Sequence, residues 1–286
     1  MQGSLDSIEV LDSRLFQVVV RRLADSLSYG TDHSPFLGSG IEYVQSRPYQ
    51  AGDSVRAVDW RVTARTGRFH VKEYEAPKSM PVYMLLDTSA SMVVSSIQKS
   101  KYALALYLAG GIALACLDRV SPVGVLGVGE RSMLIRPSLS KSQIMTWLLA
   151  LRHFRYDEAT NLGRRISELS PSLRSRALVL VFSDLHDEAC MPALKRLSQR
   201  HDCAVVQLKD PAEDSLRGAG FLRAKEAETG RVFSTHGKRR HLDQDIVNAE
   251  LRRAGIDHLT LSTDQPYVHS VRHFFESRGL LGRGAR

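Results

Sequence analysis

Short stretches of this 286-residue chain carry side-chain oxygens that could bind a cation. In the segment VYMLLDTSASM, Asp87 ends an apolar run, and Ser89 and Ser91 follow at alternate positions. One carboxylate and two hydroxyls are hard oxygen donors, which suit Mg²⁺ or Mn²⁺ better than zinc. The spacing therefore favours a hard divalent cation beside this loop.

Two more oxygen donors follow later in the chain. Asp184 ends ALVLVFSD, the most apolar run of the sequence, and Thr160 in EATNLGRRI precedes an expected helix. Taken singly, such residues are more often helix caps or turn residues. In open α/β sheets, however, ligands collect at the carboxyl ends of the strands. Three pieces in this order therefore indicate one common site.

Alternating strands and helices after Pro81 predict the scaffold that brings these donors together. Apolar runs predict strands at 82–86, 123–128, 132–135, 177–182, 203–208 and 256–261. Helical patterns occupy 99–117, 142–153, 162–169, 192–200, 242–254 and 268–278. This alternation predicts an α/β fold with a doubly wound, mostly parallel sheet and helices on both faces.

The first 80 residues have a different pattern and predict a separate, small α+β region. Apolar residues at helical spacing within 1–29 predict an amphipathic helix, and strands are expected at 41–45 and 68–74. Two prolines make 76–81 a connector. We therefore expect one domain over 1–80 and another over 81–286, with a basic hairpin inserted near 217–240.

The block RPYQAGDSVRAVDWRVTARTG lies in the first of these regions. Asp53, Arg56 and Asp59 are spaced three apart, so a helical turn would align them as acid, base and acid. The block could be a docking surface for a peptide or an anion. The favoured alternative is that arginines pair with the two aspartates and lock the small domain onto the sheet. The residues concerned are Arg47, Tyr49, Asp53, Arg56, Asp59, Trp60 and Arg65.

Together the two motifs resemble known families over about residues 38–184. The block RPYQAGDSVRAVDWRVTARTG is similar to the signature of the bacterial domain-of-unknown-function 58 family. The sequence DTSAS, followed by Thr160 and Asp184, resembles the metal-ion-dependent adhesion site of von Willebrand factor A domains.

The resemblance implies a site for Mg²⁺ or Mn²⁺ with three hydroxyls and two carboxylates, the carboxylates binding directly or through water. These residues are Ser89, Ser91, Thr160, Asp87 and Asp184. It further implies that a carboxylate from another protein fills the remaining coordination position. Because such proteins are often paired with MoxR-type AAA+ ATPases, an ATPase of that type is the implied partner.

The same motif argues against an enzyme. A phosphatase of the haloacid-dehalogenase kind also places an aspartate at a strand end, but it needs a second aspartate two residues later as general acid. Ser89 occupies that position here. The sequence also contains neither a GxSxG elbow nor a P-loop. We expect a non-enzymatic protein-interaction module.

Nucleic-acid binding is the alternative function. Lys and Arg outnumber Asp and Glu by 39 to 31, and basic residues gather between 217 and 241. Such a hairpin could follow a phosphate backbone, although a solvated face or docking to an acidic protein is favoured. Phe221 and Phe233 are the two aromatic residues of this segment, which gives base stacking little support.

Composition also bounds the class of protein and its compartment. The chain is 43% hydrophobic and 24% charged, typical of a globular protein. Its longest uncharged run, 102–117, is shorter than the roughly 20 residues of a membrane span. The three cysteines form no CxxC pair, and no signal peptide is evident. We expect a reduced, cytoplasmic protein.

Overall fold

The computed structural model of the chain describes residues 2–5, 42–51, 53, 55–75, 80–118, 120–130, 133–173, 175–214, 221–225, 232–236 and 244–280. Its centre is a six-stranded sheet in the order β12-β9-β8-β4-β5-β6, in which β6 alone is antiparallel to its neighbour. The strands are β4 (Val82–Leu86), β5 (Val123–Gly127), β6 (Met133–Ser138), β8 (Leu178–Ser183), β9 (Asp202–Lys209) and β12 (Asp257–Ser262).

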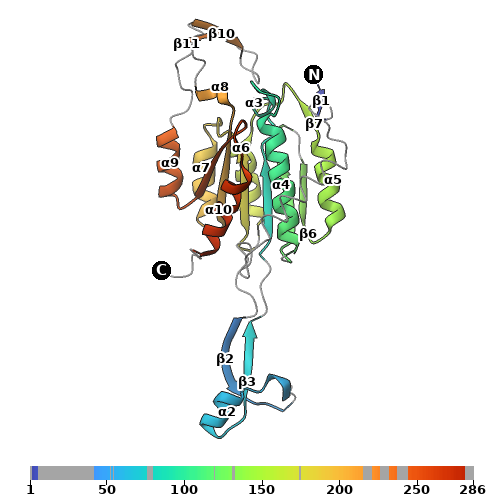
Figure 1. Cartoon of the computed structure of the whole chain (residues 1–286), viewed down its shortest axis with the longest axis vertical. Coiled ribbons are helices and arrows are strands. Elements are labelled where there is room, and N and C mark those ends of the chain that lie inside the picture. Colours follow the sequence, from blue (N-terminus) through green and yellow to red (C-terminus); the bar gives the residue numbers. More distant parts are fainter. Residues whose placement is uncertain are drawn as a thin grey trace.

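Helices cover both faces of this sheet (Figure 1). One hydrophobic core lies between the sheet and α3 (Ala90–Val93), α4 (Lys101–Asp118), α5 (Lys141–Leu151) and α10 (Val268–Leu280). A second core lies between the opposite face and α6 (Leu162–Leu169), α7 (Cys190–Ser198) and α9 (Gln244–Arg253). The expected doubly wound, mostly parallel α/β fold is therefore confirmed.

The central strands are apolar without alternation because both of their faces are covered. Every residue of β8 and of β5 is buried, as is typical of parallel strands between two helical layers. Helix α4 is buried along most of its length in the first core, which explains its uncharged sequence. No helix of the described residues is long and apolar enough to cross a membrane.

A separate lobe, here called the arm, consists of β2 (Glu42–Pro48), η2 (Val55–Ala57), α2 (Trp60–Thr66) and β3 (His70–Glu75). Its two strands pair antiparallel, and Figure 1 shows it at the end of the molecule opposite to the β10–β11 hairpin. Since β3 leads through 76–81 into the start of β4, the arm joins the edge of the sheet where the parallel strands begin. The strand ends, and Asp87 with them, lie at the other edge.

The beginning of the chain does not belong to the arm, although we expected residues 1–80 to form one region. Strand β1 (Gln2–Ser4) pairs with β7 (His153–Arg155), and Leu5 is buried in the first core. Burial of Leu5 and backbone pairing hold this segment on the large domain. The helix expected within 1–29 lies outside the described residues.

The expected insertion is a hairpin of β10 (Phe221–Lys225) and β11 (Val232–His236), which pair antiparallel. The chain enters it after β9 and the four-residue helix α8 (Pro211–Asp214). The side chains of the hairpin, on which the expectation of a basic surface depends, lie outside the described residues.

Candidate metal site

The sheet brings two of the expected carboxylates to one edge. Strands β4 and β8 are neighbours, with Leu86 opposite Phe182. The register continues for one more residue, because the Asp87 N–H donates to the Phe182 carbonyl at 3.0 Å. Asp184 follows two residues after Phe182, and the exposed fractions of Asp87 and Asp184 are 1% and 2%. Both carboxylates are therefore buried at the ends of adjacent strands.

The loop after β4 turns tightly around Asp87. One carboxylate oxygen of Asp87 accepts the Ser89 N–H at 3.0 Å, and the other accepts the Ser183 hydroxyl at 2.6 Å. The Ser89 and Ser91 hydroxyls share a hydrogen bond, with their oxygens 3.0 Å apart. Ser89 precedes α3 but makes no side-chain capping bond, so helix capping does not account for its hydroxyl.

The charges in this loop are only partly compensated. Burial, and next the charge of Asp184, raise the pKa of Asp87 to about 7. The pKa of Asp184 is lowered instead, because hydrogen bonding to His186 and the positive charge of Lys101 outweigh the effect of burial.

Lys101 is the residue that sequence reasoning missed. It begins α4, has an exposed fraction of 2%, and donates to Asp184 Oδ2 at 2.8 Å. It also donates to Glu213 on α8. His186 Nδ1 lies 3.1 Å from the same oxygen of Asp184. A lysine directly before an uncharged helical run was the available signal, but neither of its partners is near it in sequence.

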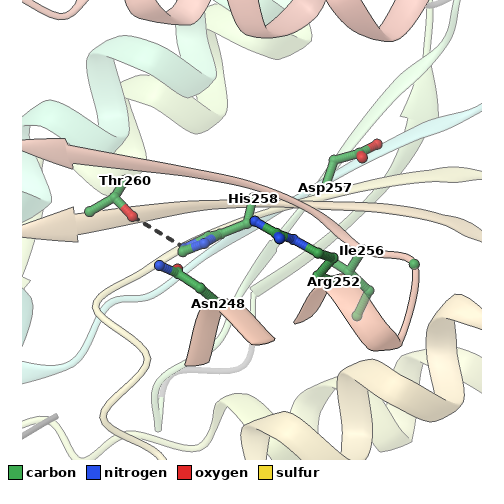
Figure 2. A pocket seen from close by; sticks show the side chains of 7 residues that line it. Asn248, Arg252, Ile256, Asp257, His258 and Thr260 are labelled. Atoms are coloured by element: carbon green, nitrogen blue, oxygen red, sulfur yellow. Dashed lines mark hydrogen bonds between the residues drawn. The ribbon is translucent and has the colours of Figure 1, made fainter. Parts of the chain in front are cut away.

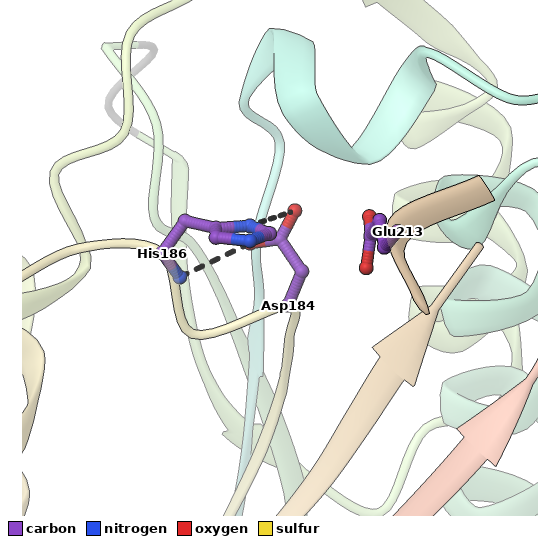
Figure 3. A group of neighbouring side chains, drawn as sticks. All are labelled: Asp184, His186 and Glu213. Carbon is purple, nitrogen blue, oxygen red and sulfur yellow. Dashed lines mark hydrogen bonds and ion pairs between the residues drawn. The ribbon is translucent and has the colours of Figure 1, made fainter. Parts of the chain in front are cut away.

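Figure 3 shows Asp184 and His186 on the loop after β8, with Glu213 facing them from α8. One ligand atom of each residue lies within 4.8 Å of the others, so these three residues form a group that could hold a metal ion. Asp210, just before α8, accepts hydrogen bonds from Ser95 and Ser96 in the loop that precedes α4. Short side-chain contacts therefore fasten α8 across this edge of the sheet.

Thr160 lies in a segment that packs against the Asp87 loop. Glu158 accepts the Thr88 hydroxyl at 2.7 Å through its carboxylate and the Ala90 N–H at 2.8 Å through its carbonyl. The Asn161 N–H donates to the carbonyl of Val128, the residue after β5. The residue before α6 is Asn161, so Thr160 is not its N-cap. Asp87, Ser89, Ser91 and Asp184 thus meet at one edge, with the Thr160 segment beside them.

Gly129 allows this close packing. A Cβ atom at this position would collide with the Glu158 carboxylate and the Thr88 hydroxyl, the pair that joins the two segments. The reason for glycine here is space and not backbone conformation, since the φ of Gly129 is not in the left-handed region. The absence of a side chain at Gly129, just after β5, thus leaves room for the contact between Glu158 and Thr88.

The residues present fit a small, hard cation. Adjacent ligands of an octahedral Mg²⁺ at 2.1 Å lie about 3.0 Å apart, and the Ser89 and Ser91 oxygens have this separation. The nearby donors are carboxylate and hydroxyl oxygens, the ligands that Mg²⁺ and Mn²⁺ prefer. A cation beside Asp87 would also offset the cost of its buried charge.

Comparison with known proteins identifies the family. The model of the family described as "Protein of unknown function DUF58" matches residues 45–254, more than half of the chain. The chain belongs to the DUF58 family. The match begins in the arm and extends beyond Asp184, so it includes both motifs found in the sequence.

Similar proteins share most of their length with this DUF58 chain. Uncharacterized protein Mb1516 of Mycobacterium bovis is 25% identical over 97% of this chain and 92% of its own. Uncharacterized protein Rv1480 of Mycobacterium tuberculosis gives the same values. The crystal structure of the conserved hypothetical protein BatB from Bacteroides thetaiotaomicron aligns with a TM-score of 0.48 and 15% identity, covering 70% of this chain and 98% of that one.

Both aspartates of the DUF58 signature block form their hydrogen bonds within the arm. The Asp53 carboxylate accepts two bonds from Arg47, at 2.7 and 2.8 Å, and the Gln50 N–H at 2.8 Å. Arg47 thus takes the role expected of Arg56, whose side chain lies outside the described residues. The pairing holds β2 to the following turn and does not reach the sheet.

Asp59 also differs from the expected ladder. It caps α2, accepting the N–H groups of Arg61 and Val62 at 3.1 and 3.2 Å, and it accepts the Ser46 hydroxyl at 2.6 Å. Because its backbone is extended, Asp59 cannot continue a helical turn from Asp53. Arg65 is exposed and has no ion-pair partner within the described part of the chain.

Aromatic side chains in the block and just after it are exposed at the junction of the arm's elements. The Tyr49 N–H donates to the Phe69 carbonyl, and the Asp59 N–H donates to the next carbonyl, that of His70. Tyr49, Phe69 and Trp60, the residue after Asp59, are all exposed, with Trp60 at 64%. A docking role for the arm therefore remains an open prediction.

A cavity of about 450 Å³ lies elsewhere, between α9 and β12 (Figure 2). Asn248 and Arg252 line it from the helix, and His258 and Thr260 line it from the strand. Burial, with a smaller effect of Lys209, lowers the pKa of His258 to about 4, so its imidazole is neutral at pH 7. None of the residues predicted for the metal site lines this cavity.

Proposed function

We propose that this DUF58 protein is a non-enzymatic, metal-dependent protein-interaction module. Its large domain is proposed to be of the von Willebrand factor A type, with Mg²⁺ or Mn²⁺ at the strand ends. The cation would be held by five residues: Asp87, Ser89, Ser91, Thr160 and Asp184. A carboxylate from a partner protein would complete its coordination. Ser89 replaces the general acid that a phosphatase needs, so the site binds without catalysis.

One observation carries the proposal. Two buried carboxylates, Asp87 and Asp184, end adjacent strands, and the Ser89 and Ser91 oxygens beside them are at the spacing of adjacent magnesium ligands. Lys101 compensates Asp184, but Asp87 has no cationic partner among the described residues, and a buried carboxylate without one is unfavourable. A divalent cation bound at this edge supplies that compensation and presents a Lewis-acidic position to an incoming acid.

The first test is cation binding by the isolated protein. A ligand that binds the native state alone stabilises it by mass action, by about 2.7 kcal/mol at 100 times its Kd. Thermal melts in EDTA and in Mg²⁺ or Mn²⁺ should therefore differ for the wild type, and the difference should disappear in Ser89→Ala and Asp87→Ala. Asp264→Asn, at an exposed position, is the matched control and should keep the shift. Equal melting temperatures for the wild type with and without cation would refute the proposal.

The second test concerns the partner. The family resemblance points to a MoxR-type AAA+ ATPase, and a partner carboxylate on the cation requires that binding disappear in EDTA. We expect immobilised wild-type protein to retain such an ATPase in Mg²⁺, and Asp87→Ala to lose it while remaining folded. Retention by Asp87→Ala would contradict binding through the cation. Loss of binding in Trp60→Ala or Arg65→Ala would then place the contact in the arm.

Nucleic-acid binding stays the alternative. It is kept because the hairpin expected in the basic segment is present as β10 and β11. A phosphate-binding hairpin would lose affinity for DNA or RNA steeply as salt increases, and it would not respond to EDTA. The two functions therefore respond differently to the same two reagents.

A further inference from the structure

Lys101 places a positive charge inside the candidate metal site. Its ammonium group donates to Asp184 Oδ2 at 2.8 Å and to the Glu213 carboxylate, and its side chain is 3% exposed. Asp184 is one of the proposed cation ligands, so the inference that follows rests on the proposed function. The chain thus supplies a cation of its own at the point where a metal ion would need this carboxylate.

The position of Lys101 is unfavourable for an ordinary structural lysine. It is the first residue of α4, where the partial positive charge of a helix N-terminus repels a cation. The helix does not need it as a cap, because the Ser100 hydroxyl accepts the Ala103 N–H at 3.1 Å. Burying an ammonium group is also costly without partners. The two carboxylates that accept its hydrogen bonds offset the cost of burying this ammonium group. We therefore expect Lys101 to act on these carboxylates.

The charged form of Lys101 is maintained by these carboxylates. The ammonium group lies between the Asp184 and Glu213 carboxylates, and both accept hydrogen bonds from it. On the other side, Lys101 and His186 both bind Oδ2 of Asp184, while Oδ1 accepts only the long 3.4 Å bond from the His186 N–H among the described contacts. Oδ2 of Asp184 therefore has two close partners, whereas Oδ1 has one long hydrogen bond among the described contacts.

We propose that Lys101 is a positioning residue that competes with the divalent cation for Asp184. Without a metal ion, the ammonium group neutralises Asp184, holds its carboxylate at the strand end and joins it to Glu213 on α8. When a metal ion binds, two positive charges draw on the same carboxylate, so the ammonium group weakens metal binding. Lys101 thereby keeps the site folded in the absence of metal and sets the concentration at which metal binds.

The test measures the Kd for Mn²⁺ alone by calorimetry, together with thermal melts in EDTA and in Mn²⁺. Lys101→Met keeps the length of the side chain and removes its charge. We expect its melting temperature in EDTA to fall, because Asp184 and Glu213 lose their shared partner. We expect its Kd for Mn²⁺ to become about tenfold tighter or more, because a like charge next to the site is gone. Mn²⁺ should then restore the melting temperature.

Two variants separate competition from simple support. Lys101→Arg keeps the charge and should retain a Kd within about threefold of the wild type. Lys195→Met removes the charge of an exposed lysine on α7 and should change neither quantity. If Lys101→Met does not fold in EDTA, Lys101→Gln gives the answer instead. It removes the charge but keeps an N–H group that can donate to a carboxylate, so its Kd for Mn²⁺ should also become severalfold tighter.

The outcomes distinguish this inference from the proposed function. If the wild type binds Mn²⁺ and Lys101→Met binds it equally or more weakly, competition is overturned and the metal site stands. If neither protein binds Mn²⁺, both proposals fail. If Lys101→Gln folds and binds Mn²⁺ no more tightly than the wild type does, competition is likewise overturned.

Discussion

The arm and the strand ends of the large sheet each contain a pair of aspartates, but the two pairs are used differently. In the arm, Asp53 and Asp59 receive bonds from Arg47, from a serine hydroxyl and from backbone N–H groups close in sequence. At the strand ends, Asp87 and Asp184 are buried, and their pKa values are displaced in opposite directions. The first pair stabilises local structure. In the second pair Lys101 and His186 hold Asp184, whereas Asp87 has no cationic partner among the described residues.

This contrast separates structural from functional carboxylates without reference to any relative. A carboxylate that is satisfied by its own chain gains less from a cation than one that is not. A buried carboxylate with uncompensated charge is destabilising by itself, and evolution tolerates such groups where binding requires them. The comparison predicts that equivalent substitutions in the two regions will have effects of opposite sign.

The largest effect is expected from Asp87→Asn. In EDTA at pH 8 this change should stabilise the cation-free protein by about 2–4 kcal/mol, because it removes a buried charge that is costly to ionise. Urea unfolding measures the change, and Asp59→Asn is the matched substitution in the arm. A clear loss of stability in Asp87→Asn would show that Asp87 is a structural residue like Asp59.

Gly129→Ala should have the next largest effect. The added methyl group must displace the Glu158 carboxylate or the Thr88 hydroxyl, and overpacking of this kind costs about 1–3 kcal/mol. Because the same pair holds the Thr160 segment against the Asp87 loop, the response to Mn²⁺ should also decrease. Gly67→Ala is the control in the arm: nothing lies within 4 Å of an added Cβ there, although its positive φ adds strain. An unchanged Mn²⁺ response in Gly129→Ala would separate the Thr160 segment from the site.

Asp59→Ala should destabilise the arm by about 1 kcal/mol, the usual cost of a lost N-cap. Hydrogen exchange at the amides of Arg61 and Val62, which Asp59 caps, should become faster. Asp59→Asn keeps an acceptor and should show a smaller change. Since the arm and the strand ends are at opposite edges of the sheet, the thermal shift with Mn²⁺ should stay as in the wild type. A lost shift would mean that the two regions are coupled.

The smallest effect concerns Asp53 and pH. Hydrogen bonding to Arg47, first, and to the Gln50 N–H lowers the pKa of Asp53 to about 2. The contribution of this pair to stability is therefore complete above the ordinary value of 3.8 and is lost as the pH falls towards 2. Carboxyl titration followed by NMR should give the low value in the wild type and a value closer to 3.8 in Arg47→Gln. Equal titration curves would show that the ion pair does not persist in solution.

The sequence predicted the sheet well because its signals are local. A continuous apolar run such as ALVLVF determines a buried parallel strand, and the residue that follows it must lie at the strand end. Asp87 and Asp184 could therefore be placed at one edge before any coordinates were known. The apolar runs of β4 and β8 were found within one residue of their bounds.

Long-range pairings could not be predicted in the same way. Glu213 meets Lys101 across 112 positions, and no spacing rule relates two such residues. The pairing of β1 with β7 is similarly distant. In the arm, Asp53 and Asp59 fit helical spacing, but capping by Asp59 started a new helix and broke the expected ladder. Short polar side chains compete with the helix for backbone groups, which periodicity does not register.

The small helix α8 has a mechanical consequence. Asp210, just before α8, accepts hydrogen bonds from the loop that precedes α4. Glu213, within α8, accepts one from Lys101, the first residue of α4. These contacts hold the four-residue helix against the start of α4. Six residues, 215–220, separate α8 from β10, so an extended chain could span about 25 Å at most between Asp214 and Phe221. A ligand bound to the β10–β11 hairpin is therefore connected through a short segment to α8, whose Glu213 contacts the lysine beside Asp184.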